Sequence, residues 1–317
     1  MAGFGVYGVT LITDTELAVS LPESGDPPDV AFELVHTSPA LEPLGDVEPV
    51  YVEGRRGDGR PDFAFWDLDD RAVIRITGAM DFHLWSDRIV CHLTAPEFRY
   101  LVEVALFGMV FALWLERRGT LTLHGAAVVV DGRGVAFLAS GGGGKTSTSA
   151  AFTRSGHPIL SDDLLALEER DDAVFVRPGL PQVRMWPEQA RHFVGTDTGF
   201  PMVDPNRSKL RIPVGDGFGS FASGPAPLTH VYVLERGAEA DAPTTHRLRP
   251  SQAALALIHH SFLSREVVRY GLQGPRLELL ARIVGSVPIS RVVVPTGLDR
   301  LGDLVAAIED EAAGTPG

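Results

Sequence analysis

The stretch Ala139-Ser140-Gly141-Gly142-Gly143-Gly144-Lys145-Thr146 decides the fold. Four consecutive glycines let the backbone curl so that successive N–H groups point at one anion. The lysine ammonium then reaches the outer phosphates of a nucleotide, and the threonine hydroxyl is a ligand for Mg²⁺. The usual pattern begins with glycine, where this chain has Ala139.

The flanks of this stretch strengthen the interpretation. Residues 134–139 have the composition of a buried strand, and residues 146–154 that of a helix whose N-terminus would hold a phosphate. The alternative is a glycine-rich surface turn that happens to precede Lys-Thr. We expect the phosphates to be bound by Ser140, Gly141, Gly142, Gly143, Gly144, Lys145, Thr146 and Ser147.

Composition narrows the class of protein. Of 317 residues, 44% are hydrophobic and 22% charged, which is typical of a globular protein with one large or two smaller domains. The net charge of −13 argues against a nucleic-acid partner or an anionic membrane. Cys91 is the one cysteine, so an intrachain disulfide is excluded. The first residues lack the basic and apolar regions of a signal peptide, so we expect a cytoplasmic protein.

The chain before the phosphate loop falls into two parts. Residues 1–93 alternate short β-like runs with Gly, Pro and Asp turns, which predicts an N-terminal antiparallel β lobe. Residues 94–118 predict a buried apolar helix that begins at a Thr94 capping box and is too short in its apolar part to span a membrane. We assign this helix, with the rest of residues 94–317, to a second domain.

A hairpin leads into the phosphate loop. Residues 121–130 predict a strand, Asp131-Gly132-Arg133-Gly134 a tight turn, and residues 135–139 the strand that enters the loop. A doubly wound nucleotide-binding fold would enter this strand through a parallel crossover instead. The hairpin therefore predicts a mixed sheet.

Two adjacent carboxylates follow the loop helix. Asp162 and Asp163 come at the end of a short apolar strand that begins after Gly156-His157. Phosphoryl transfer needs one acid to hold Mg²⁺ and another to accept the proton of an attacking hydroxyl. Because side chains alternate along a strand, the two acids cannot do the same job. The alternative for the pair is a helix cap or turn.

Lysine is rare in this chain, which makes Lys209 a candidate as well. Of the 28 basic residues only Lys145 and Lys209 are lysines, so a surviving lysine marks a place where a compact ammonium is needed. Strand alternation places Lys209 and Arg211 on one face, where both cations would serve the transferring phosphoryl group. A chance surface lysine is the alternative.

These motifs resemble a known family. Leu123-His124-Gly125, the hairpin, the loop, Gly156-His157 and Ser161-Asp162-Asp163 follow the order and spacing of the HPr kinase/phosphorylase catalytic domain, whose core is similar to phosphoenolpyruvate carboxykinase. The remaining segments look like the branch of HPr-kinase-like proteins associated with bacterial peptide natural-product clusters. The resemblance implies an α/β fold with a mixed-sheet P-loop kinase core, behind the N-terminal β lobe.

The resemblance also implies roles for residues. Lys145 and Thr146 would bind the nucleotide phosphates and Mg²⁺, and the acid pair would supply a metal contact and a base, with the metal assigned to Thr146 and Asp163. His124 would lie close to the pair, or else be an ordinary strand-end histidine bonded in the core.

We therefore expect an ATP- and Mg²⁺-dependent kinase that phosphorylates a hydroxyl, as of Ser or Thr in a small protein or peptide. Two alternatives remain open: a nucleotide-binding sensor or peptide-presenting module without phosphotransfer, and a kinase for a small-molecule hydroxyl. No nucleic acid or membrane partner is expected, and an oligomer is compatible with the sequence.

Overall fold

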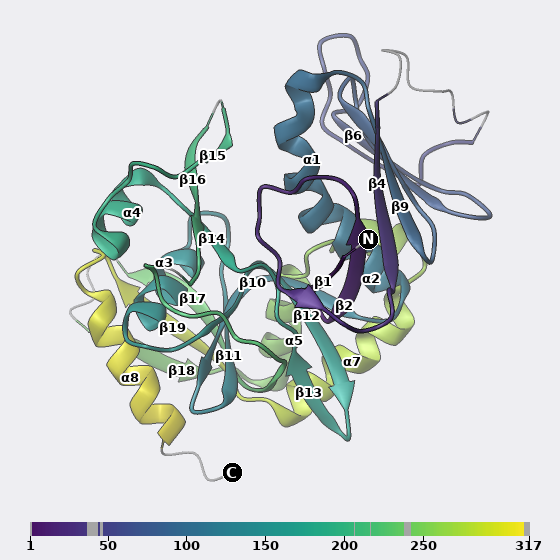
Figure 1. The fold of residues 1–317 in the computed structure, drawn as a ribbon. Helices are drawn as coiled ribbons and strands as arrows, with labels where there is room; N and C mark the ends of the chain where they lie inside the picture. The colour runs from purple at the N-terminus through teal and green to yellow at the C-terminus, as the bar shows by residue number, and fades with distance from the viewer. Residues whose placement is uncertain are drawn as a thin grey trace. The chain divides into compact units, whose positions relative to one another are not determined.

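The computed structural model describes residues 2–36, 44, 47–205, 207–215, 217–237 and 242–313. The chain forms two compact units (Figure 1): the first holds Met1–Gly119 with Leu263–Pro275, and the second holds Thr120–Phe262 with Arg276–Gly317. The apolar helix therefore groups with the first unit, whereas the sequence interpretation assigns it to the second domain. Residues 111–116 of this helix are buried, and the ring of Phe111 lies 5.7 Å from that of Tyr7.

The first unit is built on a nine-stranded sheet in the order β3-β1-β2-β4-β9-β8-β7-β6-β5. The predicted antiparallel lobe is corrected to a mixed sheet, because β4 pairs in parallel with both β2 and β9. The strands are β1 (Gly3–Val6), β2 (Val9–Thr13), β3 (Glu23–Ser24), β4 (Val30–His36), β5 (Tyr51–Glu53), β6 (Phe63–Asp67), β7 (Ala72–Ile76), β8 (Met80–Leu84) and β9 (Arg88–Leu93).

The apolar helix has an irregular centre. It comprises η1 (Pro96–Phe98), α1 (Arg99–Ala105), a π-helical turn η2 (Leu106–Val110) and α2 (Phe111–Arg117). Gly108 leaves helical geometry inside η2, and the Tyr7 hydroxyl donates to the Phe107 carbonyl at 2.8 Å. Such a turn frees a carbonyl that a side chain can satisfy. The predicted Thr94 cap is wrong, because that hydroxyl donates to Ala79 O at 2.8 Å.

This helix is long and apolar enough to cross a membrane by length and composition alone. It is the one such stretch among the described residues, at 22 residues from Pro96 to Arg117, and 67% of its apolar window is buried inside the structure. The expectation that the apolar part of this helix is too short to span a membrane is therefore contradicted by its length and composition. A buried core helix passes the same test, and Trp114 is only 2% exposed.

The second unit carries a seven-stranded mixed sheet in the order β11-β10-β12-β13-β17-β19-β18, with β17 also paired to β11. The predicted hairpin is present, because β10 and β11 form an antiparallel pair. Gly125 lies opposite Leu138 at one end of the pairing, and Val130 lies opposite Arg133 at the other. The strands are β10 (Leu121–Val130), β11 (Arg133–Leu138), β12 (Ile159–Arg170), β13 (Ala173–Val176), β17 (Ala226–Gly237), β18 (Thr244–Arg247) and β19 (Ile289–Pro295).

A small antiparallel sheet and six helices complete the described structure. The sheet has the order β14-β16-β15, and its strands are β14 (Gln182–Met185), β15 (Met202–Asp204) and β16 (Arg207–Pro213). The helices are α3 (Lys145–Arg154), α4 (Pro187–Val194), α5 (Pro250–His259), α6 (Glu266–Arg269), α7 (Gln273–Ser286) and α8 (Leu301–Ala313).

Side-chain alternation divides the core of the second unit into two layers. On one face of the sheet, Val135 and Phe137 pack in a cluster with α3 and α8. On the other face, Ala136 and Leu138 pack in a cluster with α5 and α7. A strand buried on both faces fixes its own register, because a shift of one residue would exchange the two layers. The end of β11 is therefore held firmly where the phosphate loop begins.

Candidate phosphate-binding and phosphotransfer site

The phosphate loop joins β11 to α3. Gly144 caps the helix at φ 98°, a left-handed conformation that glycine adopts without strain, and its carbonyl accepts the N–H of Thr148 at 2.8 Å. A Cβ on Gly143 would lie 2.6 Å from the Cβ of Ala139, so the loop can close only with glycine there. The first N–H groups of α3 have no partners earlier in the helix and are available to an anion.

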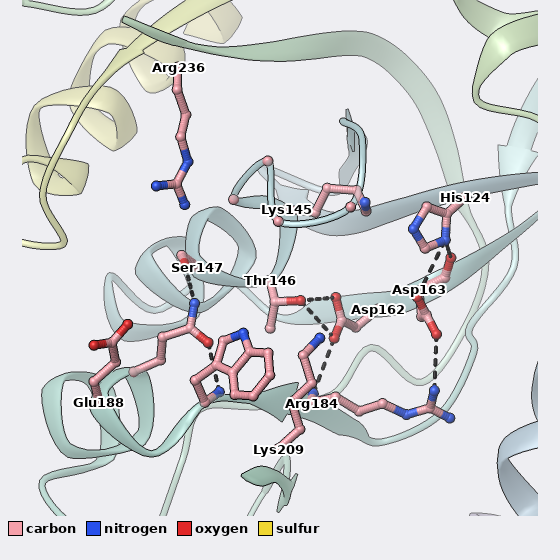
Figure 2. A pocket seen from close by; sticks show the side chains of 16 residues that line it. His124, Lys145, Thr146, Ser147, Asp162, Asp163, Arg184, Glu188, Lys209 and Arg236 are labelled. Atoms are coloured by element: carbon pink, nitrogen blue, oxygen red, sulfur yellow. Dashed lines mark hydrogen bonds and ion pairs between the residues drawn. The ribbon is translucent and has the colours of Figure 1, made fainter. Parts of the chain in front are cut away.

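A cavity of about 290 Å³ opens beside this loop, and we call it the phosphate-loop cavity. All its lining residues belong to the second unit. Figure 2 shows side chains from the loop, from β12, from β14 and from the start of α4 facing it. The lining comprises His124, Gly141, Gly142, Gly143, Gly144, Lys145, Thr146, Ser147, Asp162, Asp163, Arg184, Trp186, Glu188, Gln189, Lys209 and Arg236.

Asp162 lies against the start of the loop helix. The Thr146 hydroxyl is 3.0 and 3.2 Å from the two carboxylate oxygens, and the Arg184 backbone N–H donates to Oδ2 at 3.3 Å. Burial, and next the negative charge of Asp163, raise the pKa of Asp162 to about 6. A cation placed here would relieve this cost of ionisation.

Asp163 departs from strand geometry. The sequence predicts that alternation sends the two acids to opposite faces, but Asp163 has φ 83° and both acids line the phosphate-loop cavity. They also lie early within the long strand β12, not at its end. The Asp163 carboxylate accepts a hydrogen bond from Arg184 Nη1 at 3.0 Å, and its other oxygen lies 3.3 Å from His124 Nδ1. These two partners hold a backbone conformation that costs a non-glycine residue about 1–2 kcal/mol.

His124 is placed by its neighbours on both sides. Its backbone N–H donates to His260 O at 2.7 Å, and its ring meets that of Phe262 edge-on at 5.7 Å. Nδ1 is also 3.1 Å from the Asp163 carbonyl, so both partners of Nδ1 are acceptors and that nitrogen carries the proton. Burial lowers the pKa of His124 more than the Asp163 charge raises it. His124 is therefore a neutral imidazole with Nε2 left as an acceptor.

Both lysines reach the cavity. Lys145 is 8% exposed and its Nζ donates to Ala139 O at 2.7 Å. The pKa of Lys145 is lowered, mainly by burial and also by the positive charge of Lys209. The negative charges of Asp163 and Asp162 raise this pKa but do not outweigh burial. The Lys209 Nζ lies 5.5 Å from the centre of the Trp186 ring. Figure 2 shows Lys209 reaching in from β16, across the cavity from the phosphate loop.

The structure brings together most of the residues predicted from sequence. Among the described lining residues, Ser140 and Arg211 are absent, although both are predicted for the site. Ser140 supplies its carbonyl to the Gly143 N–H at 2.9 Å and so shapes the loop from behind. Arg211 is 6% exposed and pairs with Arg184 across β14 and β16, and of these two arginines Arg184 lines the cavity. Thr146 pairs with Asp162, whereas the predicted metal pair is Thr146 with Asp163.

Five lining residues have no counterpart in the predicted site: Arg184, Trp186, Glu188, Gln189 and Arg236. The side chain of Gln189 links two parts of the cavity. Its Nε2 donates a hydrogen bond to Ser147 Oγ at 2.6 Å, and its Oε1 accepts one from the backbone N–H of Trp186 at 2.8 Å. Arg236 follows the apolar run of β17, which is parallel to β11. Since parallel strands end at the same edge of a sheet, the end of that run was the available signal.

The acid pair and the threonine fit a magnesium ion. Mg²⁺ prefers oxygen ligands and is held in nucleotide sites by one or two protein groups, with phosphates and waters supplying the rest. Thr146 and Asp162 offer such oxygens at hydrogen-bonding distance from each other. No cluster of three or more His, Cys, Asp or Glu side chains suited to a metal occurs in the described part of the chain. A site shared between protein and nucleotide is therefore the one that the residues support.

Comparisons with known proteins add little. No protein-family model matches the chain, and no curated protein matches it. Among solved structures, the HPr(Ser) kinase/phosphatase from Coxiella burnetii aligns with 61% of this chain and 93% of its own, at 14% identity and a TM-score of 0.34. Similarity at this level carries no argument about fold or function.

Proposed function

We propose that this protein is an ATP-dependent kinase that transfers the γ-phosphoryl group to a hydroxyl. The observation that carries the proposal is the meeting of the phosphate loop with an acid pair in one cavity, where Thr146 touches Asp162 and Asp163 stays 37% exposed. A phosphate-binding loop alone would suit any nucleotide-binding protein. A second, accessible carboxylate beside it suits the removal of a proton from an attacking hydroxyl.

The residues have distinct tasks in this proposal. The loop amides, Lys145 and Ser147 bind and orient the triphosphate, and Thr146 with Asp162 would hold Mg²⁺. When bound, that ion would neutralise charge on the phosphate oxygens. Lys209 approaches from the other wall, where it would stabilise the charge spread over the oxygens of the transferring group.

The transfer forms one bond to the γ-phosphorus and breaks another. The acceptor hydroxyl oxygen attacks the γ-phosphorus, a new O–P bond forms, and the hydroxyl proton passes to Asp163. The bond from the γ-phosphorus to the bridging oxygen breaks, and ADP leaves with the electron pair. The resemblance to HPr-kinase-like proteins favours a Ser or Thr of a small protein or peptide as the acceptor.

The first test uses γ-labelled ATP, Mg²⁺ and three sets of acceptors: the products of neighbouring genes, Ser- and Thr-containing peptides, and small alcohols. We expect a phosphate adduct by mass measurement on a protein or peptide. An adduct on a small alcohol alone would identify a small-molecule kinase. ATP binding without any adduct would favour the sensor or peptide-presenting module.

Substitution of the acids gives the first prediction. Asp162→Asn and Asp163→Asn should each lower turnover by about 10²-fold or more, the typical effect of a positioned acid–base group. ATP binding should survive in Asp163→Asn, because that carboxylate faces the acceptor. Near-complete phosphotransfer by both variants would contradict the proposed kinase.

A further inference from the structure

Arg184 holds both acids of the cavity through different atoms. Its backbone N–H donates to Asp162 Oδ2 at 3.3 Å, and its guanidinium Nη1 donates to Asp163 Oδ2 at 3.0 Å. The side chain is 15% exposed, so water screens this ion pair less than it screens a surface pair. Figure 2 shows the guanidinium extended toward Asp163.

This arrangement leaves Asp163 occupied. One of its oxygens accepts Arg184 Nη1, and the other lies 3.3 Å from His124 Nδ1. A carboxylate must present an oxygen to the acceptor hydroxyl, and a guanidinium bound there competes for that position. The structure thus shows the proposed base engaged by its own neighbours.

A γ-phosphoryl group is a stronger attraction for the same guanidinium. It carries more charge than a carboxylate and presents three oxygens to the planar fork of an arginine. Arg184 lines the same cavity as the phosphate loop, which is the cavity where the triphosphate would lie. The backbone bond to Asp162 anchors the residue while its side chain changes partner.

We infer that Arg184 is a latch that exchanges Asp163 for the γ-phosphoryl group of the bound nucleotide. The inference rests on the proposed function, because it requires a nucleoside triphosphate in the cavity. In the resting protein Arg184 pairs with Asp163. With the triphosphate bound, Arg184 clamps the γ-phosphoryl oxygens and leaves Asp163 open to the acceptor, so the base is released only when there is a group to transfer.

The latch makes a prediction about affinity that needs no acceptor. If Asp163 competes for Arg184, removing that carboxylate strengthens binding of a triphosphate through Arg184. Asp163→Asn should therefore bind AMP-PNP with Mg²⁺ about 10-fold more tightly than the wild type, and ADP only slightly more tightly. Removing the negative charge of Asp163 also lessens its repulsion of the phosphates, which by itself raises the affinity. The effect of Asp163→Asn on AMP-PNP affinity must therefore be measured again in a protein that lacks Arg184.

A double-mutant cycle separates the two contributions. In the Arg184→Ala background, Asp163→Asn should give only the small gain due to reduced repulsion. Arg184→Ala alone should reduce the preference for AMP-PNP over ADP, and Lys145 and Lys209 should retain the rest of it. Trp186 lines the cavity and is the only tryptophan of the second unit, so we expect binding of either ligand to change the fluorescence of Trp186.

One control variant and one rescue experiment serve as checks. Arg191→Lys changes another Arg–Asp ion pair of the same unit, formed with Asp197 outside the cavity lining, and should leave both affinities unchanged. Guanidinium ion added to Arg184→Ala should restore part of the preference for AMP-PNP over ADP, which a merely structural arginine would not allow.

The outcomes distinguish the latch from the proposed function. An equal gain from Asp163→Asn with and without Arg184 would overturn the latch while leaving the kinase proposal intact. Wild-type protein that binds neither AMP-PNP nor ADP would overturn both. A cycle with the expected coupling but no phosphoryl transfer to any acceptor would support the exchange of partners and contradict the kinase.

Discussion

At the scale of single residues, Lys145 is the most constrained cation of the cavity. Its ammonium is buried against Ala139 O at 2.7 Å, in space that suits a point charge and not a planar fork. Lys145→Ala should weaken ATP binding by about 10-fold or more, as expected for a lost hydrogen bond between charged groups, and Lys145→Arg should also bind poorly. Arg154→Lys, at the exposed end of the same helix, is the control. Unchanged ATP affinity in both Lys145 variants, measured by calorimetry, would show that the loop does not bind phosphate.

At the scale of elements, β10 depends on a glycine beside His124. A Cβ on Gly125 would lie 2.7 Å from side-chain atoms of Leu138 and Leu165 and 2.9 Å from the Phe137 carbonyl oxygen. Gly125→Ala should therefore lower stability by about 1–3 kcal/mol, because the backbone oxygen cannot move aside without disturbing β11. Gly285→Ala in α7 has open space around it and should raise stability by about 0.5–1 kcal/mol. Thermal unfolding curves that shift equally in the two variants would be incompatible with this close approach of strands.

At the scale of the whole molecule, each unit contains a histidine that resists protonation: His83 is half-buried and His260 is buried. Burial lowers the pKa of His83 and of His260 to about 4, and His83 Nδ1 accepts Arg71 Nε at 3.0 Å, which requires an unprotonated nitrogen. The unfolded chain binds these protons below about pH 6.5, so each histidine lowers stability by up to about 1.4 kcal/mol per pH unit as pH falls from 6.5 toward 4. Above pH 6.5 neither state is protonated and the effect is absent.

The measurement is the difference between the wild type and the variants His83→Gln and His260→Gln. Between pH 6.5 and 4.5 the melting temperature of each variant should fall by less than that of the wild type. The buried carboxyls Asp81 and Asp162 act in the opposite sense because burial raises their pKa, but they are common to all three proteins. Parallel pH curves for all three proteins would argue against neutral histidines at these two positions.

Local signals predicted the strand, the glycine-rich loop and the helix that follow one another at residues 134–154, whereas long-range strand pairing was harder to predict. The Gly-rich loop, its strand and its helix follow from residues adjacent in sequence, and the Asp131–Gly132 turn predicts the β10–β11 hairpin. The parallel pairing of β4 with β9 joins distant segments, and no local pattern encodes it. Likewise the left-handed backbone of Asp163 overrides strand alternation, because His124 and Arg184 hold it from other strands.

The interleaved division of the chain has a consequence for its synthesis. The first unit is not complete until residues 263–275 exist, and within it the Tyr270 hydroxyl donates to Trp66 O at 3.0 Å while Arg117 lies over the Tyr270 ring. A ribosome makes the chain from its N-terminus, so the nascent first unit waits without its closing segment while the whole of residues 120–262 is translated. The second unit in turn includes residues that follow this closing segment in the chain. The first unit can therefore be completed only after residues 120–262 of the second unit have been translated.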